Sequence, residues 1–111
     1  MRLSLDFRFL SGSSELDNKA RRDLDRVVEF LRDTDLSGRG IRLLGFADSS
    51  GSPSANVELS RNRAQRVAGA FAERGINGVT TAGFGAAMPI ADNATPEGRE
   101  KNRRVEVWVA R

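Results

Sequence analysis

The sequence predicts an α+β domain, a two-layer sandwich in which two main helices pack on one face of a small mixed β-sheet in the order β-α-β-α-β-β. Three observations support this fold class. The chain has 111 residues, which suffices for one two-layer core and is too short for two. Its first and last predicted strands alternate apolar with polar residues, and two longer stretches between them repeat apolar residues at helical spacing. We therefore expect residues 1–111 to form a single domain.

The first half of the chain is expected to hold two strands and the helix between them. In LSLDFRF (3–9) apolar residues occupy every second position, which predicts a half-buried strand. Apolar residues at helical spacing over 18–33 predict the first helix, and DLSGRG ends it. IRLLGF (41–46) is short and mostly apolar, which predicts a strand covered on both faces.

The second main helix has clear signals at both ends. Ser52 is a suitable N-cap, and Pro53 suits the first helical position, where a backbone N–H is not needed. The helix is expected to run to Arg74, and Gly75 ends it.

Two further strands follow this helix. Residues 76–85 predict the third and 103–110 the fourth, with a short helix after Thr95 and Pro96 in the polar connection between them. One face of the fourth strand carries Trp108 and is expected to be open to a partner, a second copy of the chain in a homodimer among the candidates.

The composition excludes most catalytic chemistry. The chain has no Cys and no His, so disulfides, thiol chemistry, the usual transition-metal ligands and the commonest general base are all absent. Its serines lack the settings that activate a nucleophile. We therefore expect no enzymatic activity, no cofactor and no metal site.

Charge and hydropathy limit the classes of partner that this domain is expected to bind. Lys and Arg number 18 against 15 Asp and Glu, a net charge of +3. The basic stretches 61–66 and 99–104 contain no interleaved aromatic residues, so nucleic-acid binding is not favoured. No apolar run is long enough to span a bilayer, so we expect no insertion of this domain into a membrane.

One arginine stands in an unusual place. On a helical projection Arg63 falls inside the apolar stripe of the second helix, with Asn56 and Ser60 on the same side. A guanidinium that faces the core needs a partner or an opening onto a ligand. Leaving its charge unpaired away from water costs on the order of several kcal/mol. Asp48, just beyond the preceding strand, is the nearest candidate.

Two interpretations of this pair stay open from spacing alone. Asp48 and Arg63 form an internal salt bridge that braces the corner between strand and helix, or they are held apart and read a zwitterion. In the second case Asp48 accepts hydrogen bonds from an ammonium and Arg63 binds a carboxylate, which is the geometry of an amino-acid head group. Each residue also has a simpler interpretation: Asp48 suits a turn in which it bonds its own backbone, and Asn56 suits the first turn of a helix.

Three segments resemble one family over essentially the whole chain. GFADSSGSPSANVELSRNRAQRV (45–67) resembles the pattern G-x-x-D-x-x-G-x-x-x-x-N-x-x-L-S-x-x-R-A of the OmpA-like C-terminal domain, without a gap. GFGAAMPIADNATPEGREKNRRVEVWV (83–109) and FRFLSGSSELD (7–17) resemble its later segment and its opening strand and turn. The resemblance implies the OmpA-like fold.

The resemblance also implies a function. Such domains bind peptidoglycan through the diaminopimelate of the stem peptide and anchor envelope proteins to the cell wall, which places them in the periplasm or cell envelope of Gram-negative-type bacteria. The family's clasping Asp and Arg match Asp48 and Arg63. By the same match the pocket is lined by Asn56 and Ser50, rimmed by Arg103, and closed by the turn of Ser11, Gly12 and Ser13. The chain is then expected to be one domain of a longer exported protein.

One departure from the family pattern bears on affinity. Members often have His-Thr before the aspartate, whereas this chain has Phe46 and Ala47, so two hydrogen-bonding groups are missing. The alternative function is an OmpA-like structural or protein-interaction module that has lost its ligand, with Asp48 and Arg63 in an internal salt bridge.

Overall fold

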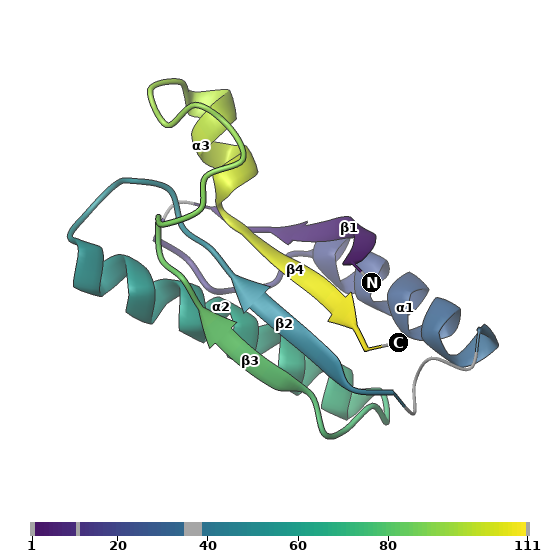
Figure 1. The fold of residues 1–111 in the computed structure, drawn as a ribbon. Helices are drawn as coiled ribbons and strands as arrows, with labels where there is room; N and C mark the ends of the chain where they lie inside the picture. The colour runs from purple at the N-terminus through teal and green to yellow at the C-terminus, as the bar shows by residue number, and fades with distance from the viewer. Residues whose placement is uncertain (1, 11, 35–38, 111) are drawn as a thin grey trace.

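The computed structural model describes residues 2–10, 12–34 and 39–110. Figure 1 shows a sheet with two long helices on one face and a short helix at one end. The elements are, in chain order, β1 (Arg2–Arg8), α1 (Asn18–Asp33), β2 (Ile41–Gly45), α2 (Pro53–Glu73), β3 (Thr80–Gly83), α3 (Pro96–Asn102) and β4 (Arg104–Val109). The predicted α+β class, the order of the strands and main helices, and the short helix before the last strand are confirmed.

The described strands form one mixed sheet in the order β1-β4-β2-β3. β4 pairs antiparallel with β1 on one side and with β2 on the other, while β2 and β3 are parallel and are joined by α2. A parallel pair needs a crossover that returns the chain to the same end of the sheet, and α2 supplies it. Consequently the loop that follows β2 and the start of α2 lie together at one end of the sheet.

The helix boundaries follow from local chemistry. Asp17 caps α1 by accepting a hydrogen bond from the Ala20 N–H at 2.8 Å. Ser52 caps α2 in the same way, with its hydroxyl 3.2 Å from the Ala55 nitrogen. Gly75 follows the last turn of α2 at a φ of 85°, a left-handed conformation that glycine adopts without steric cost. The sequence predicted both helices to within a residue.

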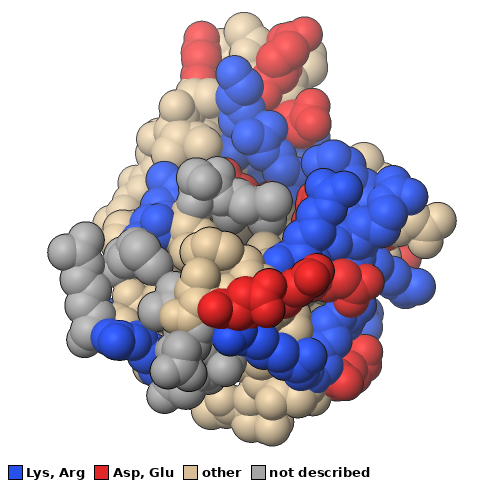
Figure 2. All heavy atoms as spheres, turned by 90° about the vertical axis from the view of Figure 1, so that its right-hand side faces the viewer, with Lys and Arg blue, Asp and Glu red and all other residues tan. Residues whose placement is uncertain are grey.

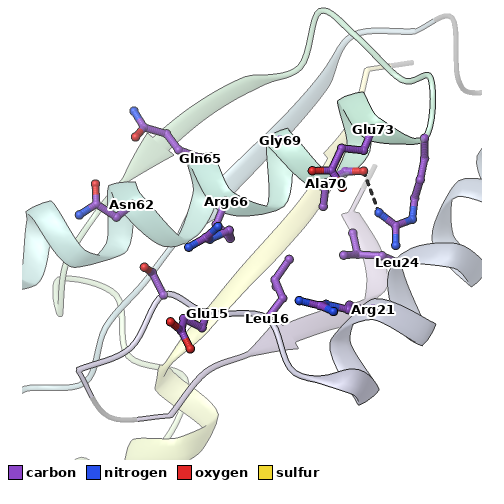
Figure 3. A pocket seen from close by; sticks show the side chains of 12 residues that line it. Glu15, Leu16, Arg21, Leu24, Asn62, Gln65, Arg66, Gly69, Ala70 and Glu73 are labelled. Carbon is purple, nitrogen blue, oxygen red and sulfur yellow. Dashed lines mark hydrogen bonds between the residues drawn. The ribbon is translucent and has the colours of Figure 1, made fainter.

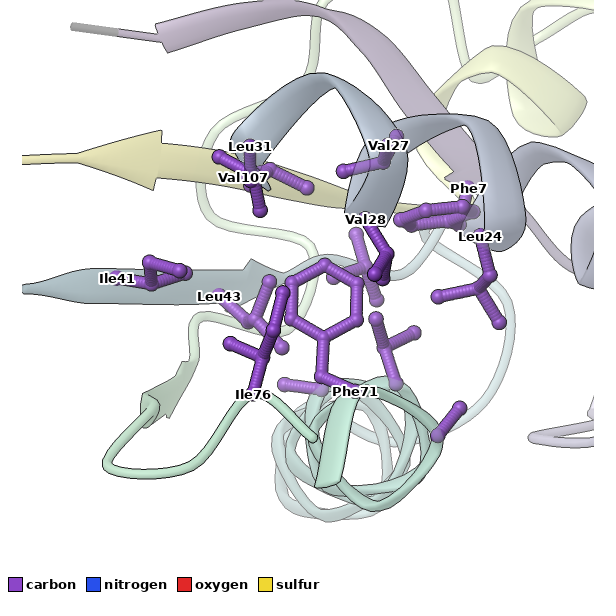
Figure 4. Packing of buried hydrophobic residues seen from close by; sticks show 14 of the residues in the cluster. Phe7, Leu24, Val27, Val28, Leu31, Ile41, Leu43, Phe71, Ile76 and Val107 are labelled. Carbon is purple, nitrogen blue, oxygen red and sulfur yellow. The ribbon is translucent and has the colours of Figure 1, made fainter. Parts of the chain in front are cut away.

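The core lies between the two main helices and the sheet. Figure 4 shows Phe71 of α2 pointing toward the sheet and α1, among Val28, Leu43 and Ile76. Phe71, Leu24, Leu31, Leu43 and Val107 are completely buried. Burying a large apolar side chain contributes about 1.5–3 kcal/mol, so this cluster is the main source of the domain's stability.

The prediction that residues 41–46 are covered on both faces is wrong. Ile41, Leu43 and Gly45 are buried, whereas Arg42 is exposed and Leu44 is half-buried. The reason is that both main helices lie on the same face, which leaves the other face of the sheet to polar and half-buried side chains. Trp108 lies on this open face, as its sequence position predicted, and is 37% exposed.

Two glycines let α2 lie unusually close to the sheet. A Cβ added to Gly45 would be 1.9 Å from the carbonyl oxygen of Ser60, and one added to Gly83 would be 2.6 Å from the nitrogen of Arg61. No larger residue fits at either position unless the helix moves. This close approach places Arg63 of α2 beside the end of β2.

Basic and acidic side chains both lie on the face of the molecule that Figure 2 shows. Figure 2 shows the side of the molecule that lies at the right of Figure 1, where a band of acidic side chains crosses a surface rich in basic ones. Within the described residues, no helix is both long and apolar enough to cross a bilayer.

Candidate functional site

A pocket of about 260 Å³ opens where the end of β2 meets the start of α2. We call it the Asp48 pocket. Its lining comes from four segments of the chain: Gly12; Ala47, Asp48, Ser50 and Gly51; Ala55, Asn56, Leu59 and Arg63; and Arg103. The fold therefore brings Asp48 and Arg63 to one opening, as the sequence predicted.

Asp48 is buried and negatively charged. It is 4% exposed, one carboxylate oxygen accepts a hydrogen bond from the Ser50 N–H at 2.9 Å, and the other accepts one from Nη1 of Arg103 at 2.9 Å. Burial by itself raises the pKa of Asp48, but the Ser50 N–H and the Arg103 guanidinium outweigh it, and the pKa lies below its ordinary value. The carboxylate is thus ionised at neutral pH.

Arg63 is held by backbone carbonyls. Its side chain is 0% exposed, and Nε, Nη1 and Nη2 donate to the carbonyls of Ser13 at 2.8 Å, Phe46 at 3.2 Å and Leu10 at 3.0 Å. Burial lowers the pKa of Arg63 to about 10; the positive charge of Arg103 acts in the same direction and Asp48 opposes it. The group is therefore still cationic at neutral pH.

The guanidinium of Arg63 has donors left over. A guanidinium carries five N–H groups, and the three carbonyls take one from each nitrogen, which leaves one on Nη1 and one on Nη2. Arg63 is one of the residues that line the pocket, and these two N–H groups have no acceptor among the described residues.

The predicted alternative of a salt bridge between Asp48 and Arg63 is wrong, because Asp48 pairs with a different arginine. The ion pair of Asp48 in the described residues is with Arg103, at 2.9 Å. Both oxygens of Asp48 are already engaged, and Arg63 is drawn instead to the carbonyls of the turn after β1. The pocket therefore contains two guanidinium groups and one carboxylate.

The other predicted pocket residues take different parts. Asn56 is 7% exposed, lines the pocket, and makes no side-chain hydrogen bond to any described residue. Ser50 lines the pocket and holds Asp48 through its backbone N–H, and Gly12 lines the pocket at a φ of 69°. Ser13 instead anchors Arg63 through its carbonyl. Ser11 lies outside the described residues.

Arg103 and Arg104 have distinct roles. Arg103 reaches the rim, where its side chain is 14% exposed and Nε donates to the Phe9 carbonyl at 2.9 Å. Arg104 points to the open face of the sheet, forms an ion pair with Glu106 at 2.8 Å, and lies 3.9 Å over the ring of Phe46. Arg104 therefore braces the sheet, whereas Arg103 belongs to the pocket.

Sequence reasoning missed the carbonyls that hold Arg63, those of Leu10, Ser13 and Phe46. No sequence signal could have identified them, because every residue has a backbone carbonyl. The two departures from the family pattern are buried: the Phe46 ring stacks on Phe84 with centroids 5.5 Å apart, and Ala47 forms a wall of the pocket.

The chemistry available to this site is electrostatic. An ionised carboxylate, a guanidinium with two remaining donors and an amide without a hydrogen-bond partner among the described residues line one small opening. These groups suit an ammonium and a carboxylate carried on one carbon. Across residues 2–10, 12–34 and 39–110, no group of three or more His, Cys, Asp or Glu side chains is arranged to hold a metal ion.

Known proteins are similar to this chain in sequence and in fold. Residues 8–103 match the model of the OmpA family. Peptidoglycan-binding protein ArfA of Mycobacterium tuberculosis is 48% identical over 71 residues, which cover 62% of this chain and 22% of ArfA. The chain thus spans about a fifth of the length of that relative.

Two solved structures are also similar. The C-terminal domain of Helicobacter pylori MotB superposes with a TM-score of 0.86 at 28% identity, covering 96% of this chain and 84% of that one. The cell wall anchor of the type VI secretion system of Pseudomonas aeruginosa superposes with a TM-score of 0.74 at 32% identity, covering 89% and 71%. Because the family model covers most of the chain and the fold agrees with these structures, the chain belongs to the OmpA family.

Proposed function

We propose that this domain binds peptidoglycan through the free amino-acid head group of diaminopimelate in the stem peptide, and so anchors its parent protein to the cell wall. The observation that carries the proposal is that Asp48 and Arg63 line one pocket, both charged, without forming an ion pair with each other. The family and its relatives support the coarser part of this function, because ArfA is named for peptidoglycan binding and the Pseudomonas structure is a cell wall anchor.

The head group is expected to lie across the pocket. Its ammonium is bound by the Asp48 carboxylate, and its carboxylate accepts hydrogen bonds from the two remaining N–H groups of Arg63. The Asn56 amide, which has no partner among the described residues, supplies a further donor or acceptor. Each charge-assisted hydrogen bond contributes about 1.5–3 kcal/mol, so two or three give weak to moderate affinity after the costs of association.

The polymer compensates for modest affinity at one site. Peptidoglycan presents the same head group many times, so a dissociated domain meets another copy nearby. The replacement of His-Thr by Phe46 and Ala47 removes two polar groups from the approach to Asp48 but leaves both charged residues in place. OmpA family domains are non-enzymatic, so binding is the whole of the proposed activity.

The cell envelope is the proposed location. The matched relatives include mycobacterial ArfA as well as proteins of Gram-negative species, so the periplasm of a Gram-negative-type bacterium is a narrower part of the proposal. A homodimer through the open face around Trp108 also stays a prediction, and sedimentation velocity of the purified domain tests it.

A matched pair of stem tripeptides tests the ligand. One carries meso-diaminopimelate at the third position, and the other carries lysine, whose side chain ends in an amine with no carboxylate. Isothermal titration calorimetry is expected to show binding of the diaminopimelate tripeptide and at least about tenfold weaker binding of the lysine form, since the Arg63 contact is lost. Equal affinities for the two tripeptides would refute head-group recognition.

A further inference from the structure

We propose that a second subsite for the same stem peptide lies in the groove between α2 and the segment that leads into α1. This inference rests on the proposed function and extends it, because it concerns the residues of the stem next to diaminopimelate. We call the site the α1–α2 groove. The residues that carry the argument are Glu15, Arg21, Asn62, Arg66, Gly69 and Glu73.

The groove is large and its charged side chains face inward. Its volume is about 930 Å³, several times that of the Asp48 pocket. Figure 3 shows Arg66 reaching from α2 and Arg21 reaching from α1 into the space between the two helices, with Glu15 and Leu16 on the segment below them. A peptide in extended conformation fits such a space.

Four charged side chains that line this groove, Glu15, Arg21, Arg66 and Glu73, are exposed and have no partner among the described residues. The side chains of Arg21 and Arg66 form no ion pair or hydrogen bond with any residue in the described part of the chain, and neither do those of Glu15 and Glu73. Arg74, at the end of the groove, shows the contrast, because it is paired with Asp25 at 2.7 Å. The two arginines of the groove can therefore bind carboxylates of a ligand, and the two glutamates can accept hydrogen bonds from its N–H groups.

Gly69 is an unexplained residue at the floor of this groove. It lies in the interior of α2, where glycine is the least favourable residue apart from proline. Packing does not require it, because a Cβ added there meets nothing within 4 Å. Its effect is to leave the helix surface low and open where the groove passes over it, as a site for close approach of a ligand requires.

The α1–α2 groove and the Asp48 pocket share no lining residue, but neighbouring parts of the same two segments line them. Arg63 and Arg66 are one helical turn apart on α2, about 4.5 Å along its axis, and Gly69 is about 4.5 Å further. Gly12 lines the pocket, and Glu15 of the same segment lines the groove. An extended peptide advances about 3.3–3.6 Å per residue, so a stem held by its diaminopimelate reaches Arg66 within two or three residues.

The occupant that this chemistry fits is the stem peptide itself. A stem carries free carboxylates in addition to that of the diaminopimelate head group, and it carries amide N–H groups. Arg21 and Arg66 are the partners for the carboxylates, and Glu15 and Glu73 for the amides. A uniform polyanion such as nucleic acid would meet repulsion from the two glutamates.

The test compares free meso-diaminopimelate, which fills the Asp48 pocket alone, with the tripeptide L-Ala-γ-D-Glu-meso-diaminopimelate. Calorimetry on the wild-type domain is expected to show about three- to tenfold tighter binding of the tripeptide, the gain of one or two exposed ionic contacts. The Arg21→Gln/Arg66→Gln variant is expected to lose that gain and to bind free diaminopimelate within twofold of wild type, on the order of experimental scatter.

A control and a second variant isolate the groove. Arg22→Gln/Arg61→Gln makes the same change of charge at two exposed arginines outside both pockets, and it is expected to keep the gain. Gly69→Leu fills the floor without changing charge, and it is expected to lose the gain while the domain stays folded.

The outcomes separate the two proposals. If the wild-type domain binds neither ligand, the proposed function and the second subsite both fall. If it binds both ligands with equal affinity, or if the control loses as much as the groove variant, the second subsite is refuted and the proposed function stands.

Discussion

Replacing Asp48 by Asn is the sharpest perturbation of the Asp48 pocket. Asn has nearly the same shape and its carbonyl oxygen still accepts the Ser50 N–H. Its amide nitrogen, however, then faces Nη1 of Arg103, which is also a donor and lies 2.9 Å from the present carboxylate oxygen. The variant therefore loses one charge-assisted hydrogen bond and leaves the two guanidinium groups of the pocket without a counter-charge.

The expected loss of stability is modest. A hydrogen bond to a charged group contributes about 1.5–3 kcal/mol. Arg103 retains its bond to the Phe9 carbonyl, and its side chain is 14% exposed, so it can relax toward water. We therefore expect a loss near the lower end, about 1.5–2 kcal/mol, which corresponds to a fall in Tm of about 6–12 °C for a domain of this size.

The expected loss of binding is larger. The ammonium of the ligand loses its anionic partner and meets two cations, so affinity for the diaminopimelate tripeptide should fall about 10- to 150-fold. Calorimetry measures the affinity, and circular dichroism measures Tm. Asp25→Asn is the matched control, since Asp25 lies outside the Asp48 pocket in an exposed ion pair with Arg74. Its loss should cost under about 1 kcal/mol and leave the binding of free diaminopimelate unchanged.

Two results would refute this reasoning. A folded Asp48→Asn variant that binds the tripeptide within about twofold of wild type shows that Asp48 does not bind the ammonium. A fall in Tm no greater than that of Asp25→Asn shows that the bond between Asp48 and Arg103 contributes nothing beyond an ordinary surface pair.

Gly45→Ala should destabilise the domain by about 3 kcal/mol or more, because the new Cβ would lie 1.9 Å from the Ser60 carbonyl oxygen and α2 must move away from the sheet. Urea unfolding measures this, with Gly69→Ala as the control that should instead gain about 0.4–1 kcal/mol; similar values for the two would disprove the close packing. Acid should also remove stability: the pKa of Asp48 lies below its ordinary 3.8, so its contribution is present above that pH and is lost as the pH falls through the lower, folded-state value. Measured across this range, the difference in Tm between wild type and Asp48→Asn should shrink toward zero, and a constant difference would contradict the assignment.

Much of the fold was predictable because the relevant signals are short-range. Apolar periodicity, the caps at Ser52 and Thr95 and the stop at Gly75 each act within a few residues, and the structure has them where the pattern indicates. The burial of Arg63 was predictable for the same reason, since its side of α2 follows from its spacing to Leu59 and Val67. Whether one or both faces of β2 are covered was not predictable, because a short apolar run is compatible with either arrangement.

The sequence by itself determined the elements, the buried position of Arg63 and the presence of two opposite charges near one corner. Tertiary structure decided which groups those charges meet: Asp48 pairs with Arg103, 55 residues away, and Arg63 bonds to carbonyls of a turn 50 and 53 residues away. Such contacts depend on distances across the folded chain, and a carbonyl acceptor belongs to every residue alike, so no local pattern encodes them. Gly45 and Gly83 let α2 pack close to the sheet, and this packing brings Asp48 and Arg63 to one pocket without pairing them with each other.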